Sequence, residues 1–315
     1  MDAQVSVIMP VYNKGEYIQK AIDSVLSQKC IEVELICIDD GSLDNSVEII
    51  ERNCLKQHNI KLIRQTNAGA GVARNTGMEQ SSAECVSFLD PDDWYPSDNV
   101  LSTLYAGIKR SNCSISMGKR LYYVKPFILK RKDNLFFEGA HSFSELTSAF
   151  LYQSCMFTRE LLVDNSIYFP CYRRFQDPPF FLKAMSVTGD FYFVNNYVHC
   201  YRRGVQRIIW NNEKLLDYIS GVRESLNIAD EAGNRRIFNQ VLDSLNHASF
   251  TEGVLKNASD SVISALYEIE KYIKEVSNGR YIGIRALQIM QSENIIKKRA
   301  SIMALSLENG IKSVF

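Results

Sequence analysis

The chain has 315 residues, which is long enough for one large domain or two ordinary ones with a sizeable buried core. Apolar residues make up 46% and charged residues 23%, so the composition is that of a globular protein and not of a disordered one. Lysine and arginine together number 36, as do aspartate and glutamate, and this balance does not indicate a nucleic-acid-binding protein.

The cysteines and the hydropathy pattern indicate the cellular compartment that we expect for the protein. The eight cysteines form no CxxC pair and have no histidines at zinc spacing, and several lie in apolar strand-like runs, where a free thiol behaves as a small hydrophobe. No signal peptide precedes them, so we expect reduced thiols and a cytoplasmic protein. No run approaches the roughly 18 apolar residues of a membrane span, so we expect the chain not to cross a membrane.

The first hundred residues alternate between strand and helix patterns. Strands are predicted at Val5–Met9, Val33–Ile38, Ile60–Ile63 and Glu84–Leu89, and helices at Lys14–Gln28, from Asp44 onward and at Ala70–Gln80. Such alternation with short connections predicts an α/β fold with a parallel sheet covered by helices on both faces.

Beyond residue 110 the pattern changes twice. Between about 110 and 205, short strands are predicted at Ile115–Met117, Arg120–Val124, Phe191–Val194 and Val198–Tyr201, and a helix opens at Asp177, where two prolines suit the first turn. After Asn211, helices are predicted at Glu213–Asp230, Arg235–Leu255, Ser259–Val276 and Glu293–Leu307. We therefore divide the chain into a domain of residues 1–210 and a helical C-terminal extension of residues 211–315.

Acidic residues follow two of the predicted strands. Asp39 and Asp40 end the second strand, and the run Asp90-Pro91-Asp92-Asp93 follows the fourth. The carboxyl ends of parallel strands meet at one edge of a sheet, where ligands bind, so we expect both clusters to face a single crevice. Three carboxylates so close together repel one another unless a positive charge shares the site. A Mg²⁺ or Mn²⁺ ion that also binds phosphate oxygens would supply that charge, and a solvated turn is the alternative.

Four motifs in a fixed order reveal a family resemblance. They are VSVIMPVYN at residues 5–13, IDDGSLD at 38–44, NAG at 67–69 with RNTG at 74–77, and FLDPDD at 88–93. This ordered set resembles the family 2 glycosyltransferases, over roughly residues 4 to 205. The resemblance implies a GT-A fold, a Rossmann-like, mostly parallel sheet flanked by helices. It also implies that residues 1–110 bind a nucleotide-sugar and that residues 111–210 receive the acceptor.

The resemblance assigns roles to individual residues. It implies nucleotide-sugar contacts by Pro10, Tyr12, Asp39, Asp40, Arg74 and Asp90. Within this set, Tyr12 and Asp40 would contact the base, with Asp39 supporting the turn. Asp92, with Asp90 beside it, would bind the Mg²⁺ or Mn²⁺ ion at the diphosphate. Asp177 would be the base that deprotonates the acceptor, although Gln176 stands where the family usually has a first acid.

The implied function is a metal-dependent inverting glycosyltransferase. It would move a sugar from a nucleotide-sugar, most simply a UDP-sugar, to a glycan or lipid-linked saccharide in bacterial surface polysaccharide assembly. Two alternatives stay open. A non-catalytic nucleotide-sugar or glycan-binding module of this fold is left open by Gln176. A sugar-nucleotide nucleotidyltransferase needs a glycine-rich basic loop after the first strand, and Pro10–Gly15 is poor in glycine.

Two basic segments and one histidine have competing interpretations. The aromatic and basic stretch of residues 119–132 is either a hairpin with solvated lysines or a contact for anionic lipid headgroups or a diphosphate-linked acceptor. The basic helix around Ile295–Arg299 suits a membrane surface, the helical extension or a second subunit in a homodimer. His199 is interpreted as a strand-buried or surface histidine in preference to a phosphate or metal contact.

Overall fold

The computed structural model describes residues 3–130, 136–204, 208–277 and 283–291. The chain divides into two compact units. The first comprises Met1–Glu145, Phe150–Cys171 and Lys183–Val205, and the second comprises Leu146–Ala149, Tyr172–Leu182 and Gln206–Phe315. The second unit thus includes eleven residues around Asp177 as well as most of the helical C-terminal third.

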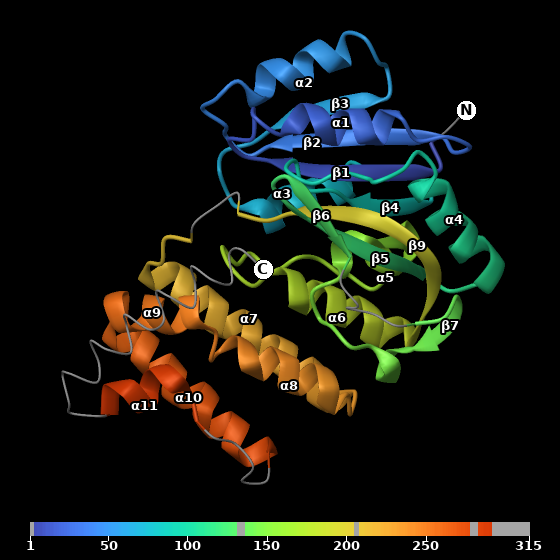
Figure 1. The fold of residues 1–315 in the computed structure, drawn as a ribbon. Helices are drawn as coiled ribbons and strands as arrows, with labels where there is room; N and C mark the ends of the chain where they lie inside the picture. Colours follow the sequence, from blue (N-terminus) through green and yellow to red (C-terminus); the bar gives the residue numbers. More distant parts are fainter. Residues whose placement is uncertain (1–2, 131–135, 205–207, 278–282, 292–315) are drawn as a thin grey trace. The chain divides into compact units, whose positions relative to one another are not determined.

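A nine-stranded sheet forms the centre of the first unit (Figure 1). Its strands are β1 (Val5–Val11), β2 (Val33–Asp39), β3 (Ile60–Arg64), β4 (Cys85–Phe88), β5 (Ile115–Val124), β6 (Phe127–Lys130), β7 (Gly139–Ser142), β8 (Cys155–Thr158) and β9 (Asp190–Arg202). The order is β3-β2-β1-β4-β8-β5-β9-β7, with β6 paired to β5. The predicted α/β fold class is confirmed, and the strands from β3 to β4 are parallel. Beyond β4 the sheet is mixed, because β8 runs antiparallel to both β4 and β5.

Helices cover both faces of this sheet (Figure 1). They are α1 (Ile18–Leu26), α2 (Ser46–Cys54), α3 (Ala70–Glu79), α4 (Val100–Ser111) and α5 (Arg159–Asp164), while α6 (Asp177–Thr188) contributes residues to both units. The alternation of side chains along β1 divides the core. Val7 and Met9 join a buried cluster with α1, α2 and α4. Ile8 lies against α3, where a Cβ added to Gly77 would come within 2.4 Å of its side chain. The absence of a side chain at Gly77 therefore allows α3 to pack closely on β1.

Several elements differ from the sequence prediction. β5 and β9 are each continuous where two short strands were expected, and the register between them shifts near Met117 and Lys119. The helix α4 was not predicted, although Leu101, Leu104 and Ile108 have the spacing of a buried helical face. Short strands whose burial depends on distant neighbours, such as β7 and β8, were also missed. The expected helix at residues 293–307 lies outside the described residues.

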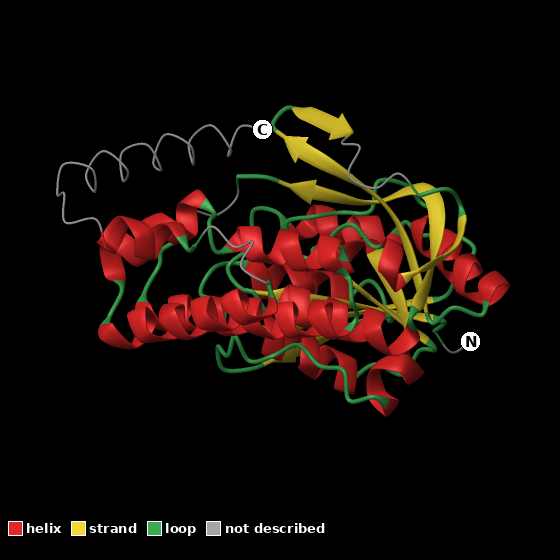
Figure 2. Cartoon of the chain, turned by 90° about the horizontal axis from the view of Figure 1, so that it is seen from below, coloured by secondary structure: helices red, strands yellow, loops and turns green. Residues whose placement is uncertain are grey.

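The second unit contains helices and no strand in its described residues (Figure 2). They include α7 (Asn212–Glu231), α8 (Arg235–Ser244), α9 (Ala248–Asn257), α10 (Asp260–Val276) and α11 (Arg285–Gln291). The single helix predicted at residues 235–255 is broken, because the side chain of His247 accepts a hydrogen bond from the Ser249 N–H and starts α9. Tyr218 of α7 stacks on Phe250 of α9 with ring centroids 4.5 Å apart, which joins these helices through their apolar faces.

Burial also governs the cysteine chemistry. All eight cysteines are free thiols, and only Cys30 and Cys171 are exposed. Burial raises the pKa of Cys85 to about 12 and that of Cys200 to about 11, so neither forms a thiolate at neutral pH. No helix in the described part of the chain is long and apolar enough to cross a membrane.

The close approach of α3 to β1 predicts a large effect of one substitution. Gly77→Val should lower the free energy of unfolding by about 1–3 kcal/mol, because its side chain overlaps Ile8. Glu79→Val adds the same side chain to an exposed position of the same helix and should cost only about 0.5 kcal/mol. Urea unfolding of both variants measures the difference, and equal losses would contradict the packing described here.

Candidate active site

The acidic turn, Asp90-Pro91-Asp92-Asp93, follows β4, and each of its carboxylates has a nitrogen partner from a different element. Asp90 pairs with Arg74 of α3 at 2.7 Å, and Asp92 pairs with Lys14 of the β1–α1 loop at 2.6 Å. Asp93 contacts the imidazole of His199 on β9 at 2.8 Å. The protein itself therefore supplies a partner for each carboxylate, and the three pairs differ in burial and chemistry.

The Asp93–His199 pair is a buried anchor. Both side chains are excluded from solvent, and the second oxygen of Asp93 accepts a hydrogen bond from the Arg202 backbone N–H at 2.8 Å. Burial raises the pKa of Asp93, because the favourable contact with His199 only partly offsets the loss of hydration. Two backbone hydrogen bonds between Trp94 and Cys200 add to the attachment. This pair fixes the acidic turn to β9, and the interpretation of His199 as a strand-buried residue is confirmed.

In the Asp90–Arg74 pair, the arginine packs against two aromatic rings. The Arg74 guanidinium lies 5.1 Å from the Tyr152 ring and 5.2 Å from the Phe169 ring, and only 3% of the residue is exposed. Burial opposes the ionisation of Asp90, but the charge and hydrogen bond of Arg74 outweigh it and lower the pKa of this carboxyl. Asp90 therefore stays ionised, and its ion pair with Arg74 holds this part of the turn against α3.

Asp92 differs because its partner is a lysine on a loop. Its side chain is 19% exposed, and one oxygen, Oδ2, receives the Lys14 ammonium. An ammonium on a four-carbon chain can move away at lower cost than a stacked guanidinium. The Asp92 side chain is as exposed as that of Asp90, at 20%, so the two carboxylates differ in the kind of partner and not in exposure. The Asp92 backbone carbonyl accepts a hydrogen bond from Arg202 Nε at 2.9 Å, which holds the main chain of the turn. Asp92 is thus the carboxylate of the turn that can exchange its partner.

The second acidic cluster organises a loop. Asp40 is 3% exposed, and its carboxylate accepts hydrogen bonds from the Gln65 side chain and from the N–H groups of Ala68 and Gly69, all at 2.8 Å. Gly69 has a φ of 98°, a conformation that glycine adopts without strain. Three of the roughly four acceptor positions of this carboxylate are occupied by the protein, so one remains for a ligand donor. The base contact assigned to Asp40 stays a prediction.

The remaining first-unit residues lie at the same sheet edge. Asp39 accepts a hydrogen bond from the Ser42 N–H at 3.1 Å, and Pro10 is buried opposite Ile38 in the β1–β2 pairing. Tyr12 follows directly after β1 and is 43% exposed, so its ring is available for a ligand. β2 and β4 flank β1 on its two sides, and the chain reverses its strand order there. Ligands of open α/β sheets bind at such a point.

The assigned base, Asp177, lies in the other unit. It is the first residue of α6, as predicted, and is half-buried. Because it belongs to the second unit and the nucleotide-side residues to the first, its part in the site stays a prediction.

Sequence reasoning missed two contributors. Lys14 stands in a loop whose lysine carries no periodic signal, and its contact with Asp92 joins residues 78 positions apart. Gln65 follows β3, and its Nε2 donates to Asp40. Gln65 follows a strand end, as the two acidic clusters do, and this position could have identified it as a site residue.

The acidic turn offers few free oxygen ligands to a divalent cation. The described residues contain no group of three or more histidine, cysteine, aspartate or glutamate side chains that could hold a metal. Mg²⁺ is commonly bound by only one or two carboxylates together with substrate phosphates. Asp92 fits this pattern if Lys14 withdraws, whereas both oxygens of Asp93 are already engaged. The residues therefore fit a cation that takes part of its coordination from a phosphate ligand.

The β1–α1 loop uses its backbone donors internally. The N–H groups of Asn13 and Lys14 donate to the hydroxyls of Ser42 and Ser46, and the N–H of Gly15 donates to Asp44. A phosphate-binding loop needs such N–H groups pointing at its ligand. This loop therefore lacks the construction of a phosphate cradle.

The chain was compared with known proteins. The family described as Glycosyl transferase family 2 matches residues 6–167, slightly more than half of the chain. Glycosyltransferase GlyA of Streptococcus pneumoniae serotype 4 is 40% identical over 39% of the chain, and this match spans only 17% of GlyA. Glycosyltransferase GlyG of the same organism is 26% identical over 64% of the chain and 72% of GlyG. The crystal structure of Staphylococcus aureus TarS 1–349 in complex with UDP-GlcNAc superposes with a TM-score of 0.69 at 23% identity, over 89% of this chain and 84% of that one. The likeness supports the predicted GT-A fold.

The different burial of the three pairs predicts different costs of removing a carboxylate. Asp93→Ala should destabilise the protein by about 3–5 kcal/mol, because it leaves His199 buried without its partner. Asp92→Ala removes a pair whose side chains are 11% and 19% exposed and leaves a lysine that can turn toward solvent, so it should cost less, about 1–2 kcal/mol. Thermal and urea unfolding measure both values. A larger loss for Asp92→Ala would contradict the division into a buried anchor and an exchangeable carboxylate.

Proposed function

The chain belongs to glycosyl transferase family 2, and from this premise we propose that it transfers a sugar from a UDP-sugar to a saccharide acceptor with inversion at the anomeric carbon. The observation that carries the proposal is the convergence of Tyr12, Asp40 and the acidic turn at the carboxyl edge of β1, β2 and β4. One end of this edge offers an exposed ring and a buried carboxylate, and the other offers the exchangeable Asp92.

We assign the nucleoside to the first end. Tyr12 would pack on the base, and the remaining acceptor position of Asp40 would take an N–H of the uracil ring. Asp90, held by Arg74, would accept a hydrogen bond from a ribose hydroxyl. UDP-GlcNAc is the ligand of the TarS structure named above, which supports a uridine donor here.

The diphosphate would lie beside Asp92 and Lys14. A Mg²⁺ or Mn²⁺ ion bound there would stabilise the negative charge that develops on the leaving nucleotide. Asp92, with Asp90 adjacent, would hold this ion. Lys14 would exchange its contact with Asp92 for a phosphate oxygen, which keeps the local charge balanced. The fixed pairs of Asp90 and Asp93 would keep the turn in place during this exchange.

Asp177 would accept the proton of the attacking hydroxyl. Its place at the first residue of α6 leaves a carboxylate at a helix start, where the helix dipole favours the ionised form. A single displacement with such a base inverts the anomeric configuration. In this proposal residues 111–210 form the acceptor half, residues 211–315 form an extension, and the acceptor belongs to surface polysaccharide assembly at the inner face of the cell membrane.

The nucleotidyltransferase alternative loses support from the β1–α1 loop. Its N–H groups are bonded to side chains of residues 42–46 and are not directed at a ligand. The assay described next distinguishes the transferase from a non-catalytic binding module.

The test compares two helix-start carboxylates. With Mn²⁺ and a panel of UDP-sugars, the parent protein should release UDP as the sugar is transferred to a supplied saccharide or to water. Asp177→Asn should lower this rate about 100- to 10,000-fold with little change in UDP affinity, because the base is lost. Asp260→Asn alters an exposed acid at the start of α10 and should leave the rate unchanged.

Two results would overturn the proposal. A parent protein that binds UDP but turns over no donor would support the binding module. An Asp177→Asn variant as active as the parent would remove Asp177 from the mechanism.

A further inference from the structure

The hairpin of β5 and β6 ends in an exposed apolar tip. The hairpin tip, Lys125–Lys130, reads Lys-Pro-Phe-Ile-Leu-Lys, and all six residues are exposed. Phe127 is 67%, Ile128 55% and Leu129 39% exposed. Within the described residues β6 pairs only with β5, so nothing described in the first unit covers these side chains. Consecutive exposed apolar residues of this size commonly mark an interaction site.

The register of the hairpin places apolar residues on both faces. Leu129 lies opposite Tyr122, and Ile128 lies opposite Tyr123, one residue further along β5. Successive side chains of a strand point to opposite faces, so Leu129 and Ile128 project in opposite directions. A flat protein surface would bury only one of these faces. A medium that surrounds the tip, such as the interface of a bilayer, would bury both.

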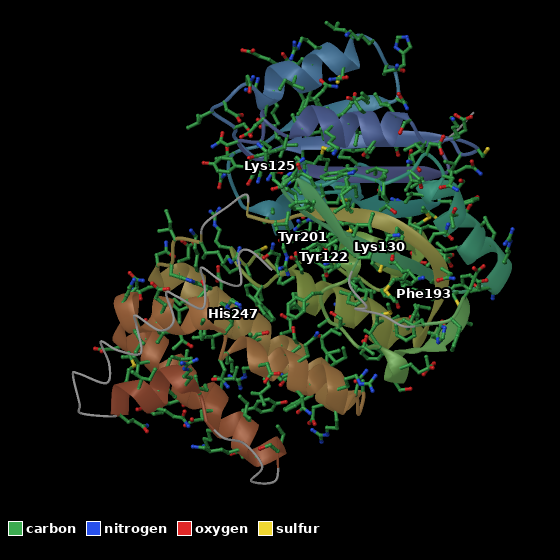
Figure 3. All side chains as sticks on the ribbon, in the orientation of Figure 1. Tyr122, Lys125, Lys130, Phe193, Tyr201 and His247 are labelled. Carbon is green, nitrogen blue, oxygen red and sulfur yellow. The ribbon has the colours of Figure 1, made fainter. Side chains whose placement is uncertain are left out.

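The surrounding charge is positive. Residues 115–130 contain four lysines and arginines and no acidic residue, although the whole chain has a formal net charge of zero. In the sequence, Lys125 and Lys130 bracket Pro126 and the apolar triplet, and Figure 3 labels both lysines. The Lys130 ammonium lies 5.4 Å from the ring of Tyr197. Lysines beside aromatic and apolar residues suit a surface of anionic headgroups over hydrocarbon.

The hairpin leaves the sheet beside the acidic turn. β5 is parallel to β9, whose end carries Arg202. The ring of Tyr123 on β5 is 5.3 Å from Trp94, which directly follows the acidic turn, and 5.0 Å from the Arg202 guanidinium. Figure 3 also places Tyr122 of β5 next to Tyr201 of β9. A surface that receives the tip would therefore lie close to the carboxyl edge of β1, β2 and β4, where we propose that the donor binds.

We propose that the hairpin tip inserts its apolar triplet into the headgroup region of an anionic bilayer, with Lys125 and Lys130 contacting the lipid phosphates. In this position the acidic turn faces the membrane surface, where a lipid-linked saccharide presents its sugar. The membrane contact stands by itself, and the lipid-linked acceptor rests on the proposed transferase function.

The experiment uses the full chain and sedimentation with sucrose-loaded vesicles. Binding is compared between phosphatidylcholine vesicles and vesicles with 30% phosphatidylglycerol, a composition chosen for the assay at about 0.1 M salt. The parent should bind the anionic vesicles preferentially. Lys125→Gln and Lys130→Gln should each weaken binding about fivefold. Phe127→Ser with Leu129→Ser should weaken it by about tenfold or more, since both side chains lose their burial in the bilayer.

Controls separate membrane contact from folding, self-association and the enzyme reaction. Leu43→Ser with Leu55→Ser alters two leucines that are 90% and 85% exposed elsewhere and should bind like the parent. Size-exclusion chromatography with light scattering should give one mass for the parent and the hairpin variants. Release of UDP with a water-miscible acceptor should be the same for all of them, so a failure of the transferase proposal would be seen separately.

The proposal is overturned by equal binding of the parent to both vesicle types, by hairpin variants that bind as well as the parent, or by a mass that falls when the tip is changed. The last result would identify a second copy of the chain as the partner of the β6 edge.

Discussion

The crowding of three carboxylates at the end of β4 is the constraint on which the first unit depends. Asp90, Asp92 and Asp93 cannot all ionise together unless positive groups approach them. The protein brings one partner each from α3, from the β1–α1 loop and from β9. These contacts also tie α3, the β1–α1 loop and β9 to the end of β4.

Two of the three partners hold their carboxylates rigidly, and the third can be exchanged. A stacked guanidinium and a buried imidazole hold the outer carboxylates, and a lysine holds the middle one, Asp92. In the proposed function, a diphosphate and its cation would replace the Lys14–Asp92 contact and leave the other two pairs in place. On the β2 side, Asp40 uses most of its hydrogen-bonding capacity on residues 65–69 and so orders that loop. In the proposed function, this ordered loop and the exposed ring of Tyr12 would receive the nucleoside, next to the exchangeable charge of Asp92.

The sequence predicted the parts of this arrangement that depend on local periodicity. The strands β1 to β4, their intervening helices and the shared edge of the two acidic clusters all follow from alternation and strand-end rules. The contacts of Lys14 with Asp92, of Gln65 with Asp40 and of His199 with Asp93 could not be derived in the same way, because each joins distant segments. The antiparallel entry of β8 and the full length of β9 likewise depend on neighbours in space and not on their own residues. The exposed tip of β6 was visible only as a basic, aromatic stretch, since exposure on both faces is a property of the folded hairpin.

In the proposed function, Asp92 is the carboxylate of the turn that exchanges its protein partner for the cation of a bound donor. The anomalous scattering of Mn²⁺ in crystals of the protein grown with UDP and manganese tests this exchange. We expect a manganese peak at an oxygen of Asp92, with Lys14 moved away from it and with the Arg74–Asp90 and His199–Asp93 pairs unchanged. UDP bound beside an intact Lys14–Asp92 pair, with no manganese at the acidic turn, would contradict it.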